Sequence, residues 1–340
     1  MARGLENSGY LRLRLLYELG SVLPTIAIPY VPMPAAQNPN TKSGRTDTYL
    51  VSSLVTFASL RRWNPYVELQ FVTTEDPGYP WRDRFEEIGV HIRYTPFAHL
   101  PPEGFARTFM GSLYLLDVLE SSNSDYLAIV DPDVFCVGPL ESVISASAPP
   151  QALNIPSPRG VEINGLSPRE ADEIHLALGE QRVVDFHYGG EFYGVPSSMK
   201  DHIQSRVDRA WSVTLDRWSR GRSYFTTEEH VLNFALADLP VAPAENFIRR
   251  IWTAHSYRTV SGRENDLLLW HLPAEKDRGF RRLYTAATNA DSWFWNSEQS
   301  EFQWHSGRAF GFHGRDPIRF TLDLAGVTSR AIGMPRKSAG

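Results

Sequence analysis

The sequence predicts an α/β protein with a Rossmann-like mixed sheet and helices on both of its faces. In the first half, short apolar, β-branched runs alternate with segments of helical periodicity, which is typical of successive βαβ units. The run Tyr126–Val130 (YLAIV) is apolar throughout, as expected of a central strand covered on both sides. With 340 residues, 42% of them hydrophobic, the chain can form one large domain or two fused halves.

The individual elements follow from local patterns. Residues 26–31 predict the first strand. Residues 47–62 predict the first crossover helix, because Leu50, Leu54 and Phe57 recur at helical spacing after Thr46, a residue that suits an N-cap. Similar patterns predict strands at 67–73, 91–94 and 192–195, and helices at 81–88, 110–119, 198–219 and 228–237.

Composition excludes several classes of function. A formal net charge of −5 leaves no broad basic surface for nucleic acid. Cys136 is the only cysteine, which rules out a disulfide framework and a multi-thiolate metal site and favours a reducing compartment. No run approaches the roughly 20 apolar residues of a membrane span, and no secretion signal is visible, so we expect a cytoplasmic protein. Residues 10–19 mix leucines with arginines and predict a docking helix, a mobile tail or a contact with a membrane surface.

Two acids directly follow the apolar run. Asp131 and Asp133 flank Pro132, which ends regular strand pairing and lets both carboxylates face one site. Ligands of open α/β sheets collect beyond the carboxyl ends of strands, and Mg²⁺ and Mn²⁺ prefer such oxygen ligands together with substrate phosphates. The alternative is a turn that Asp131 caps while Asp133 is solvated.

Other metal and phosphate motifs fit these acids less well. An EF-hand requires further oxygen ligands at fixed offsets, where Phe135 and Cys136 stand instead. A phosphotransferase of the haloacid dehalogenase type also begins D-x-D after a strand, but expects Thr or Val in place of Phe135. It remains a minor alternative.

Two later segments carry a family resemblance. Residues 185–194 (DFHYGGEFYG) resemble the acceptor-site segment of the histo-blood-group and α-1,3-galactosyltransferase family, which reads D-F-Y-Y, three variable residues, an aromatic pair and Gly. Residues 226–233 (TTEEHVLN) resemble its W-H-D-E-S-H-L-N, with Glu229 on the catalytic Glu. The D-P-D-V-F-C-V-G-P-L block is equally similar to the glycogenin and galactinol synthase group.

The resemblance implies a glycosyltransferase A fold and retaining transfer of a sugar from a nucleoside diphosphate. Asp131 and Asp133 would hold Mn²⁺ or Mg²⁺, and His313, in a segment similar to the H-x-G motif of the glycogenin-like group, would be a third ligand. Glu229 would act at the anomeric carbon, where a helix start favours an anion, and Arg107 would neutralise the diphosphate. The other predicted substrate-binding residues are Tyr30, Asp185, His187, Tyr188, Gly189, Gly190, Glu191 and Glu228.

Each of these residues also has a structural explanation. Glu228 and Glu229 are common residues at the N-terminus of a helix. Arg107 could be an ordinary surface residue. Gly189 and Gly190 could simply form a turn before a strand. Tyr30 and His313 are equally suited to core packing and to a structural role.

The predicted organisation is a helix or tail at 1–24, a nucleotide-sugar-binding half at 25–150, an acceptor-binding and catalytic half at 151–330 and a tail at 331–340, in one compact unit. The predicted reaction moves a hexose from a nucleoside diphosphate, with UDP as the expected carrier, to a hydroxyl of a glycan, lipid or small molecule. The competing hypothesis is a non-catalytic sugar-binding or scaffold protein of the same fold.

Overall fold

The computed structural model describes residues 24–32, 47–105, 110–121, 124–155, 161–180, 187–254, 257–313 and 321. The predicted segments 10–19 and 331–340 and the predicted N-cap Thr46 lie outside them. The chain divides into two compact units, each built from separate stretches. Unit 1 comprises Met1–Gly44, Asn64–Asp131 and Leu140–Asn246, and unit 2 comprises Arg45–Trp63, Pro132–Pro139 and Phe247–Gly340.

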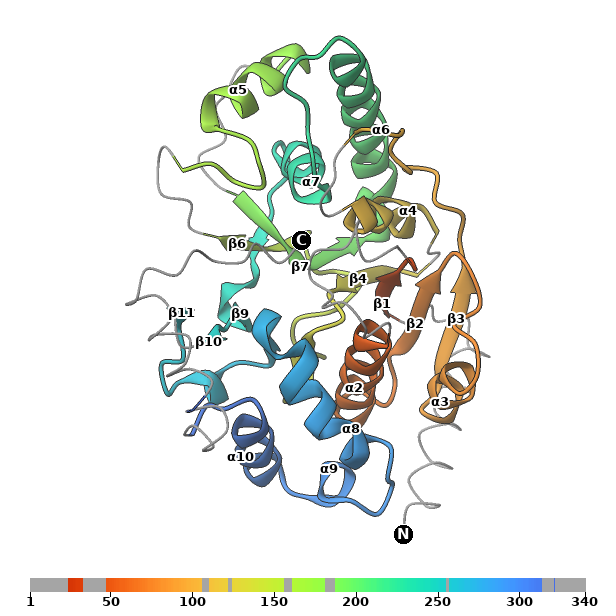
Figure 1. The fold of residues 1–340 in the computed structure, drawn as a ribbon, viewed down its shortest axis with the longest axis vertical. Helices are drawn as coiled ribbons and strands as arrows, with labels where there is room; N and C mark the ends of the chain where they lie inside the picture. The colour runs from red at the N-terminus through yellow and green to blue at the C-terminus, as the bar shows by residue number, and fades with distance from the viewer. Residues whose placement is uncertain are drawn as a thin grey trace. The chain divides into compact units, whose positions relative to one another are not determined.

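Unit 1 contains a seven-stranded sheet among its described residues, in the order β3-β2-β1-β4-β7-β6-β8 (Figure 1). Strand β1 runs parallel to β2 and β4, whereas β7 runs antiparallel to β4 and β6. The predicted α/β class with a mixed sheet is therefore confirmed. The strands are β1 (Thr25–Tyr30), β2 (Glu68–Thr73), β3 (Val90–Tyr94), β4 (Tyr126–Val130), β6 (Gln151–Ile155), β7 (His187–Pro196) and β8 (Ala242–Pro243).

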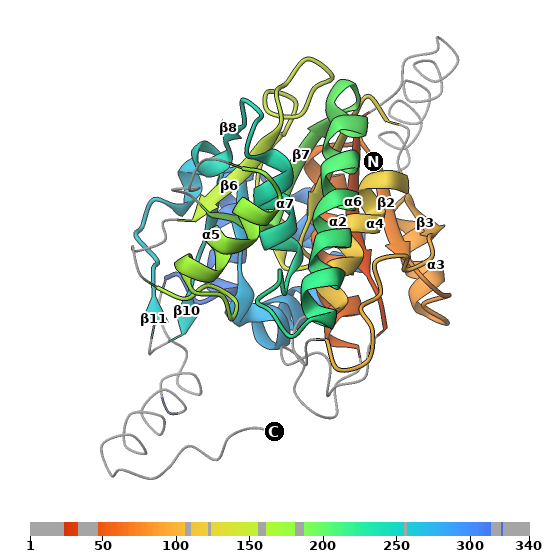
Figure 2. The same cartoon turned by 90° about the horizontal axis from the view of Figure 1, so that it is seen from above.

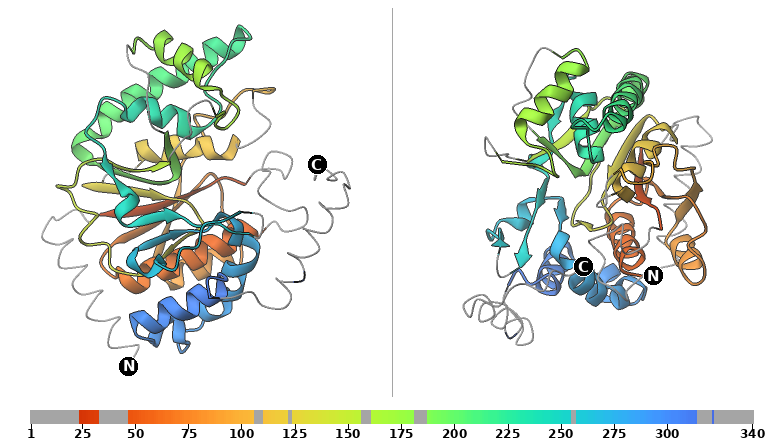
Figure 3. Two further views of the ribbon diagram at one scale, coloured as in Figure 1. Left: turned by 90° about the vertical axis from the view of Figure 1, so that its left-hand side faces the viewer. Right: turned by 45° about the horizontal axis from the view of Figure 1, so that its top comes forward.

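Three helices of unit 1, α4, α6 and α7, lie on the same face of this sheet (Figure 3), and Figure 2 shows α6 and α7 side by side. Their apolar residues, among them Leu116, Val207 and Val231, form the core with the strands beneath. No helix in the described ranges is long and apolar enough to cross a bilayer. The helical elements are α3 (Trp81–Glu87), η2 (Met110–Leu113), α4 (Tyr114–Ser121), α5 (Pro168–Ala177), α6 (Ser197–Ser219), α7 (Glu228–Leu236) and η3 (Ala244–Asn246).

Unit 2 is built around a small sheet in the order β5-β12-β9, with β12 antiparallel to β5 and parallel to β9. Its core is aromatic: Phe135 of β5 stacks on Phe302 at 5.5 Å between ring centroids and meets Phe310 edge to face at 5.0 Å. The strands are β5 (Val134–Cys136), β9 (Ile248–Arg250), β10 (Thr253–Ala254), β11 (Tyr257–Arg258) and β12 (Leu269–His271). The helical elements are α2 (Thr48–Trp63), η4 (Glu264–Asp266), η5 (Pro273–Glu275), η6 (Lys276–Phe280), α8 (Arg281–Ala287), α9 (Trp293–Asn296) and α10 (Gln299–Ala309).

Candidate active site

Strand β4 leads directly into the acidic segment. All five of its residues are buried, between β1 on one side and β7 on the other, as the apolar run predicts. The backbone N–H of Asp131 donates to the carbonyl oxygen of Glu191 on β7 at 3.2 Å, which ties the first acid to the strand end. The chain then turns at Pro132, whose carbonyl oxygen accepts the hydroxyl of Thr56 at 2.8 Å.

Asp133 is fully buried and surrounded by cationic groups of unit 2. Its backbone carbonyl accepts the N–H of Leu272 at 3.0 Å, which places the residues after β12 beside it. Lys276 Nζ donates to Asp133 Oδ2, and His271 Nε2 lies 3.5 Å from Oδ1. Burial by itself would raise the pKa of Asp133, but Lys276 and His271 outweigh it and hold the pKa well below its ordinary value. The Asp133 side chain is therefore ionised.

Asp131, Asp133 and His271 can act together as metal ligands. Each offers one ligand atom, and these atoms all lie within 4.8 Å of one another. Asp133 Oδ1 is buried, and its nearest donor in the described part of the chain, His271 Nε2, lies 3.5 Å away, so a cation could still bind this ionised oxygen. Carboxylate oxygens suit Mg²⁺ and Mn²⁺, and an imidazole nitrogen suits transition metals. The donor set therefore fits a divalent ion.

The histidine that lies beside the two acids is His271, not the predicted His313. His313 is not in this group, and its ring instead stacks on Trp304 at 6.4 Å between centroids. His271 takes the place that the sequence analysis gave to His313. A short apolar run, Leu269–Trp270, precedes His271, and Lys276 follows five residues later. A three-residue strand and one lysine form no local pattern that points to a ligand, so His271 could not be found from the sequence alone.

Glu229, at the start of α7, is held by hydrogen-bond donors of unit 1. Its Oε1 accepts the backbone N–H of Gly190 at 2.9 Å. Its Oε2 accepts the amide of Asn164 at 2.6 Å and lies 2.8 Å from His187 Nε2. Hydrogen bonds of this kind favour the charged form of a carboxylate and fix its orientation.

Asn164 was not foreseen as a site residue. It has a backbone φ of 46°, a region that non-glycine residues rarely adopt. Two hydrogen bonds stabilise this turn: the Thr226 hydroxyl donates to the Asn164 carbonyl at 2.7 Å, and His230 Nε2 lies 3.2 Å from the Ile163 carbonyl. Burial and the nearby His187 lower the pKa of His230 to about 4. His230 is consequently neutral at pH 7 and keeps Nε2–H for the Ile163 carbonyl.

Glu228, the residue before Glu229, has the opposite environment. It is 7% exposed, and its Oε2 has no hydrogen-bond partner among the described residues. Burial, followed by repulsion from the Glu229 and Asp131 carboxylates, raises its pKa to about 8, although the Ser112 hydroxyl acts in the other direction. A neutral carboxylic acid therefore lies next to an ionised one at pH 7.

The remaining predicted residues have various surroundings. Tyr30 stacks on Phe71 at 5.4 Å between centroids, which agrees with its alternative packing role. Tyr188 and Glu191 are buried on β7, and β7 also carries Gly189. Their substrate contacts remain predictions. Arg107 and Asp185 lie outside the described residues.

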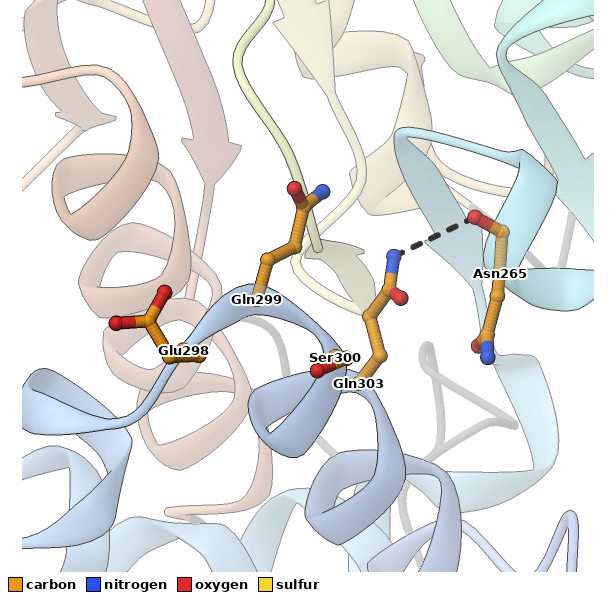
Figure 4. A pocket seen from close by; sticks show the side chains of 5 residues that line it. All are labelled: Asn265, Glu298, Gln299, Ser300 and Gln303. Atoms are coloured by element: carbon orange, nitrogen blue, oxygen red, sulfur yellow. Dashed lines mark hydrogen bonds between the residues drawn. The ribbon is translucent and has the colours of Figure 1, made fainter.

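A polar surface hollow occurs elsewhere in unit 2 (Figure 4). The side-chain amide of Gln303 donates across it to the Asn265 carbonyl at 3.4 Å. It contains none of the acids or histidines described above, so it offers no comparable chemistry. Its lining residues are Asn265, Glu298, Gln299, Ser300 and Gln303.

The chain has the glycosyltransferase A fold, as predicted. A structure of the bifunctional glycosyltransferase WbbM superposes with a TM-score of 0.50 at 10% sequence identity, over 84% of this chain and 52% of WbbM, so this chain spans about half of that protein's length. The galactosyltransferase LgtC, solved with donor and acceptor sugar analogues, aligns with a TM-score of 0.46 at 12% identity, over 88% of this chain and 99% of LgtC. At such identities the likeness concerns the fold alone. The sequence matches no protein-family model and no curated protein.

Proposed function

We propose that this protein is a metal-dependent glycosyltransferase that moves a sugar from a nucleoside diphosphate to a hydroxyl acceptor. The observation that carries the proposal is the Asp131, Asp133 and His271 group, with Lys276 hydrogen-bonded to Asp133. Two carboxylates, an imidazole and an ammonium together suit a divalent ion and the phosphates of a nucleotide.

In this proposal Asp131, Asp133 and His271 hold Mn²⁺ or Mg²⁺. The ion, when bound, stabilises the negative charge of the diphosphate leaving group. The Lys276 side chain is 12% exposed, and its ammonium group would contribute positive charge to the same phosphates. Arg107, predicted to act on the diphosphate, would add to that charge.

Glu229 would stand beneath the anomeric carbon. During retaining transfer, the bond from this carbon to the diphosphate oxygen breaks, and a bond to the acceptor oxygen forms on the same face of the sugar. The acceptor's proton leaves with the diphosphate. A fixed, ionised carboxylate can stabilise positive charge at the anomeric carbon or attack it to give a transient glycosyl ester. The donors around Glu229 supply the charge and orientation that both routes require.

The substrate assignment is also part of the proposal. The similarity of residues 185–194 and 226–233 to the galactosyltransferase motifs supports a UDP-hexose donor and a glycan, lipid or small-molecule acceptor. Tyr30, near the end of β1, is the candidate contact for the nucleotide base. Gly189, Gly190 and Glu191 on β7 are the candidates for selecting the sugar.

Calorimetric titration of the full chain with UDP, GDP, ADP and dTDP tests the proposal. We expect one nucleotide, UDP, to bind in the presence of Mn²⁺ and to lose affinity when EDTA is added. The matching UDP-hexose should then release UDP when a sugar acceptor is supplied. If none of the four nucleotides binds with Mn²⁺, the proposed function is rejected.

A further inference from the structure

His187 lies beside Glu229, and it can donate a hydrogen bond to the carboxylate only if the imidazole proton is on Nε2. It is the first residue of β7, and its side chain is only 9% exposed. Its Nε2 lies 2.8 Å from Glu229 Oε2, and its Nδ1 lies 3.4 Å from the side-chain amide nitrogen of Asn233. A neutral imidazole carries its proton on one of these two nitrogens, so the neighbours decide which.

Asn233, on α7, has an amide orientation that the backbone determines. The N–H of Tyr188 lies 2.9 Å from Asn233 Oδ1, and a backbone N–H can only donate, so this atom must be the amide oxygen. The opposite atom is then the NH₂ group. Consistently, Asn233 Nδ2 lies 2.6 Å from the carbonyl of Glu229 and 3.1 Å from that of Tyr188, and carbonyl oxygens can only accept.

The histidine tautomer follows from this orientation. A Glu229 carboxylate can only accept, so the hydrogen between it and His187 belongs to Nε2. The Asn233 NH₂ group, whose two hydrogens point at carbonyl oxygens, cannot accept, so a proton on Nδ1 would find no acceptor in Asn233. The proton is therefore on Nε2, from which it is donated to Glu229 Oε2. The backbone N–H of Tyr188 on β7 thus orients the Asn233 amide. Asn233 and Glu229 together then favour the His187 tautomer that carries its proton on Nε2.

We propose that His187 is a positioning residue, held by Asn233 in the tautomer with the proton on Nε2, that orients the Glu229 carboxylate for the reaction. The inference deepens the proposed function and rests on it for the catalytic role of Glu229. It differs from the role that the motif resemblance gives His187, which is contact with the substrate. A substrate contact would change substrate affinity, whereas a positioning residue changes the rate of the chemical step.

The first test reads the tautomer without any activity. The full chain, labelled with ¹⁵N in its ten histidines, is studied by long-range proton–nitrogen correlation, and the signal lost in His187→Gln identifies His187. We expect a protonated, pyrrole-type Nε2 and an unprotonated, pyridine-type Nδ1. Asn233→Asp should put a proton on Nδ1, because a carboxylate accepts where the amide donates. A pyridine-type Nε2 in the wild-type protein, or no change in Asn233→Asp, would overturn the proposal.

The second test separates positioning from binding. UDP release from UDP-glucose and UDP-galactose with Mn²⁺ is compared in His187→Gln and His187→Leu, with His202→Gln as the matched control because His202 pairs with Asp238 on the surface. Loss of a hydrogen bond to a charged group should lower kcat about 10- to 100-fold in His187→Leu, with the donor KM within about twofold. His187→Gln, which keeps a donor, should lose less.

The outcomes distinguish the two proposals. A raised donor KM with unchanged kcat in His187→Leu would make His187 a substrate contact and overturn the positioning role. If the wild-type protein turns over neither UDP-sugar and binds no nucleotide, the proposed function fails, and the nitrogen spectra still decide the tautomer.

Discussion

The two acid pairs of this protein, Asp131 with Asp133 and Glu228 with Glu229, show that burial does not determine the charge of a carboxyl group. Asp133 is the more deeply buried, yet its pKa is lowered, because Lys276 and His271 lie against it. Glu228 is 7% exposed and its pKa is raised to about 8, because burial disfavours its charged form and its charged neighbours are carboxylates that add to this effect. Burial raises the pKa of both acids, and only the cations beside Asp133 reverse the direction of the shift.

The largest expected effect concerns the first pair. Asp133→Asn keeps the size of the side chain but removes the charge that Lys276 and a metal ion would share. If metal stabilisation of the leaving group contributes several kcal/mol, UDP release from a UDP-hexose should fall about 10³- to 10⁴-fold. Asp266→Asn, an exposed acid paired with Arg263, is the control and should retain activity. If Asp133→Asn retained full activity, Asp133 would not be a metal ligand of the active site.

The first pair was predictable from sequence because its signal is local. An apolar run followed by D-P-D defines a buried strand and the acids at its end, and Tyr126–Val130 has the predicted bounds. The ligands from β12 were not predictable in this way. His271 comes within reach of Asp133 only because Leu269–His271 pairs with Val134–Cys136, a contact between segments more than 130 residues apart. A three-residue strand is too short for its sequence pattern to predict that pairing.

The second pair shows the same limit. The helix start at Glu228 and Glu229 follows from local pattern, and the helix predicted at 228–237 agrees with α7 to within one residue. Which glutamate is ionised depends on donors from a distant loop and strand, Asn164 and Gly190. Local sequence therefore located both acid pairs, and long-range contacts gave the acids their different properties.

Glu228 gives a pH prediction of opposite sign to that for an ion-paired acid such as Asp133. Its pKa is about 8 in the folded protein against 4.5 for the free side chain, so between these values the folded state keeps a proton that the unfolded state loses. Its contribution to the free energy of unfolding should be fully present below pH 4.5 and fall as the pH rises to 8. At about 1.36 kcal/mol per pKa unit, the loss from pH 5 to pH 8 is about 3 kcal/mol.

Urea unfolding of the wild-type protein and of Glu228→Gln at pH 5 and pH 8 measures this contribution. The glutamine variant cannot titrate at this position, so its stability should change less with pH, and it should exceed the wild type by more at pH 8 than at pH 5. Identical pH dependence in both proteins would mean that Glu228 is ionised in the folded state.

The variant Lys276→Met tests the cation that lies beside Asp133. Lys276→Met keeps the length of the side chain and abolishes its charge, so the diphosphate would lose a stabilising group, and kcat/KM should fall about 100-fold. Lys200→Met is the control, because Lys200 donates to the Glu120 carbonyl at the surface. Activity lost equally in both variants would show that Lys276 has no specific part in the site.

Gly190 tests how closely the second pair is packed, with the smallest expected effect. A Cβ at this position would lie 2.6 Å from Glu228 Oε1, so Gly190→Ala must displace that side chain. Overpacking of this kind costs about 1–2 kcal/mol. The cost should be much smaller in a Glu228→Ala background, where the obstructing oxygen is absent, and urea unfolding of the single and double variants gives the coupling energy. Equal costs in both backgrounds would locate the strain in the β7 backbone, whereas a large coupling would show that Gly190 is needed to admit the neutral Glu228 beside the ionised Glu229.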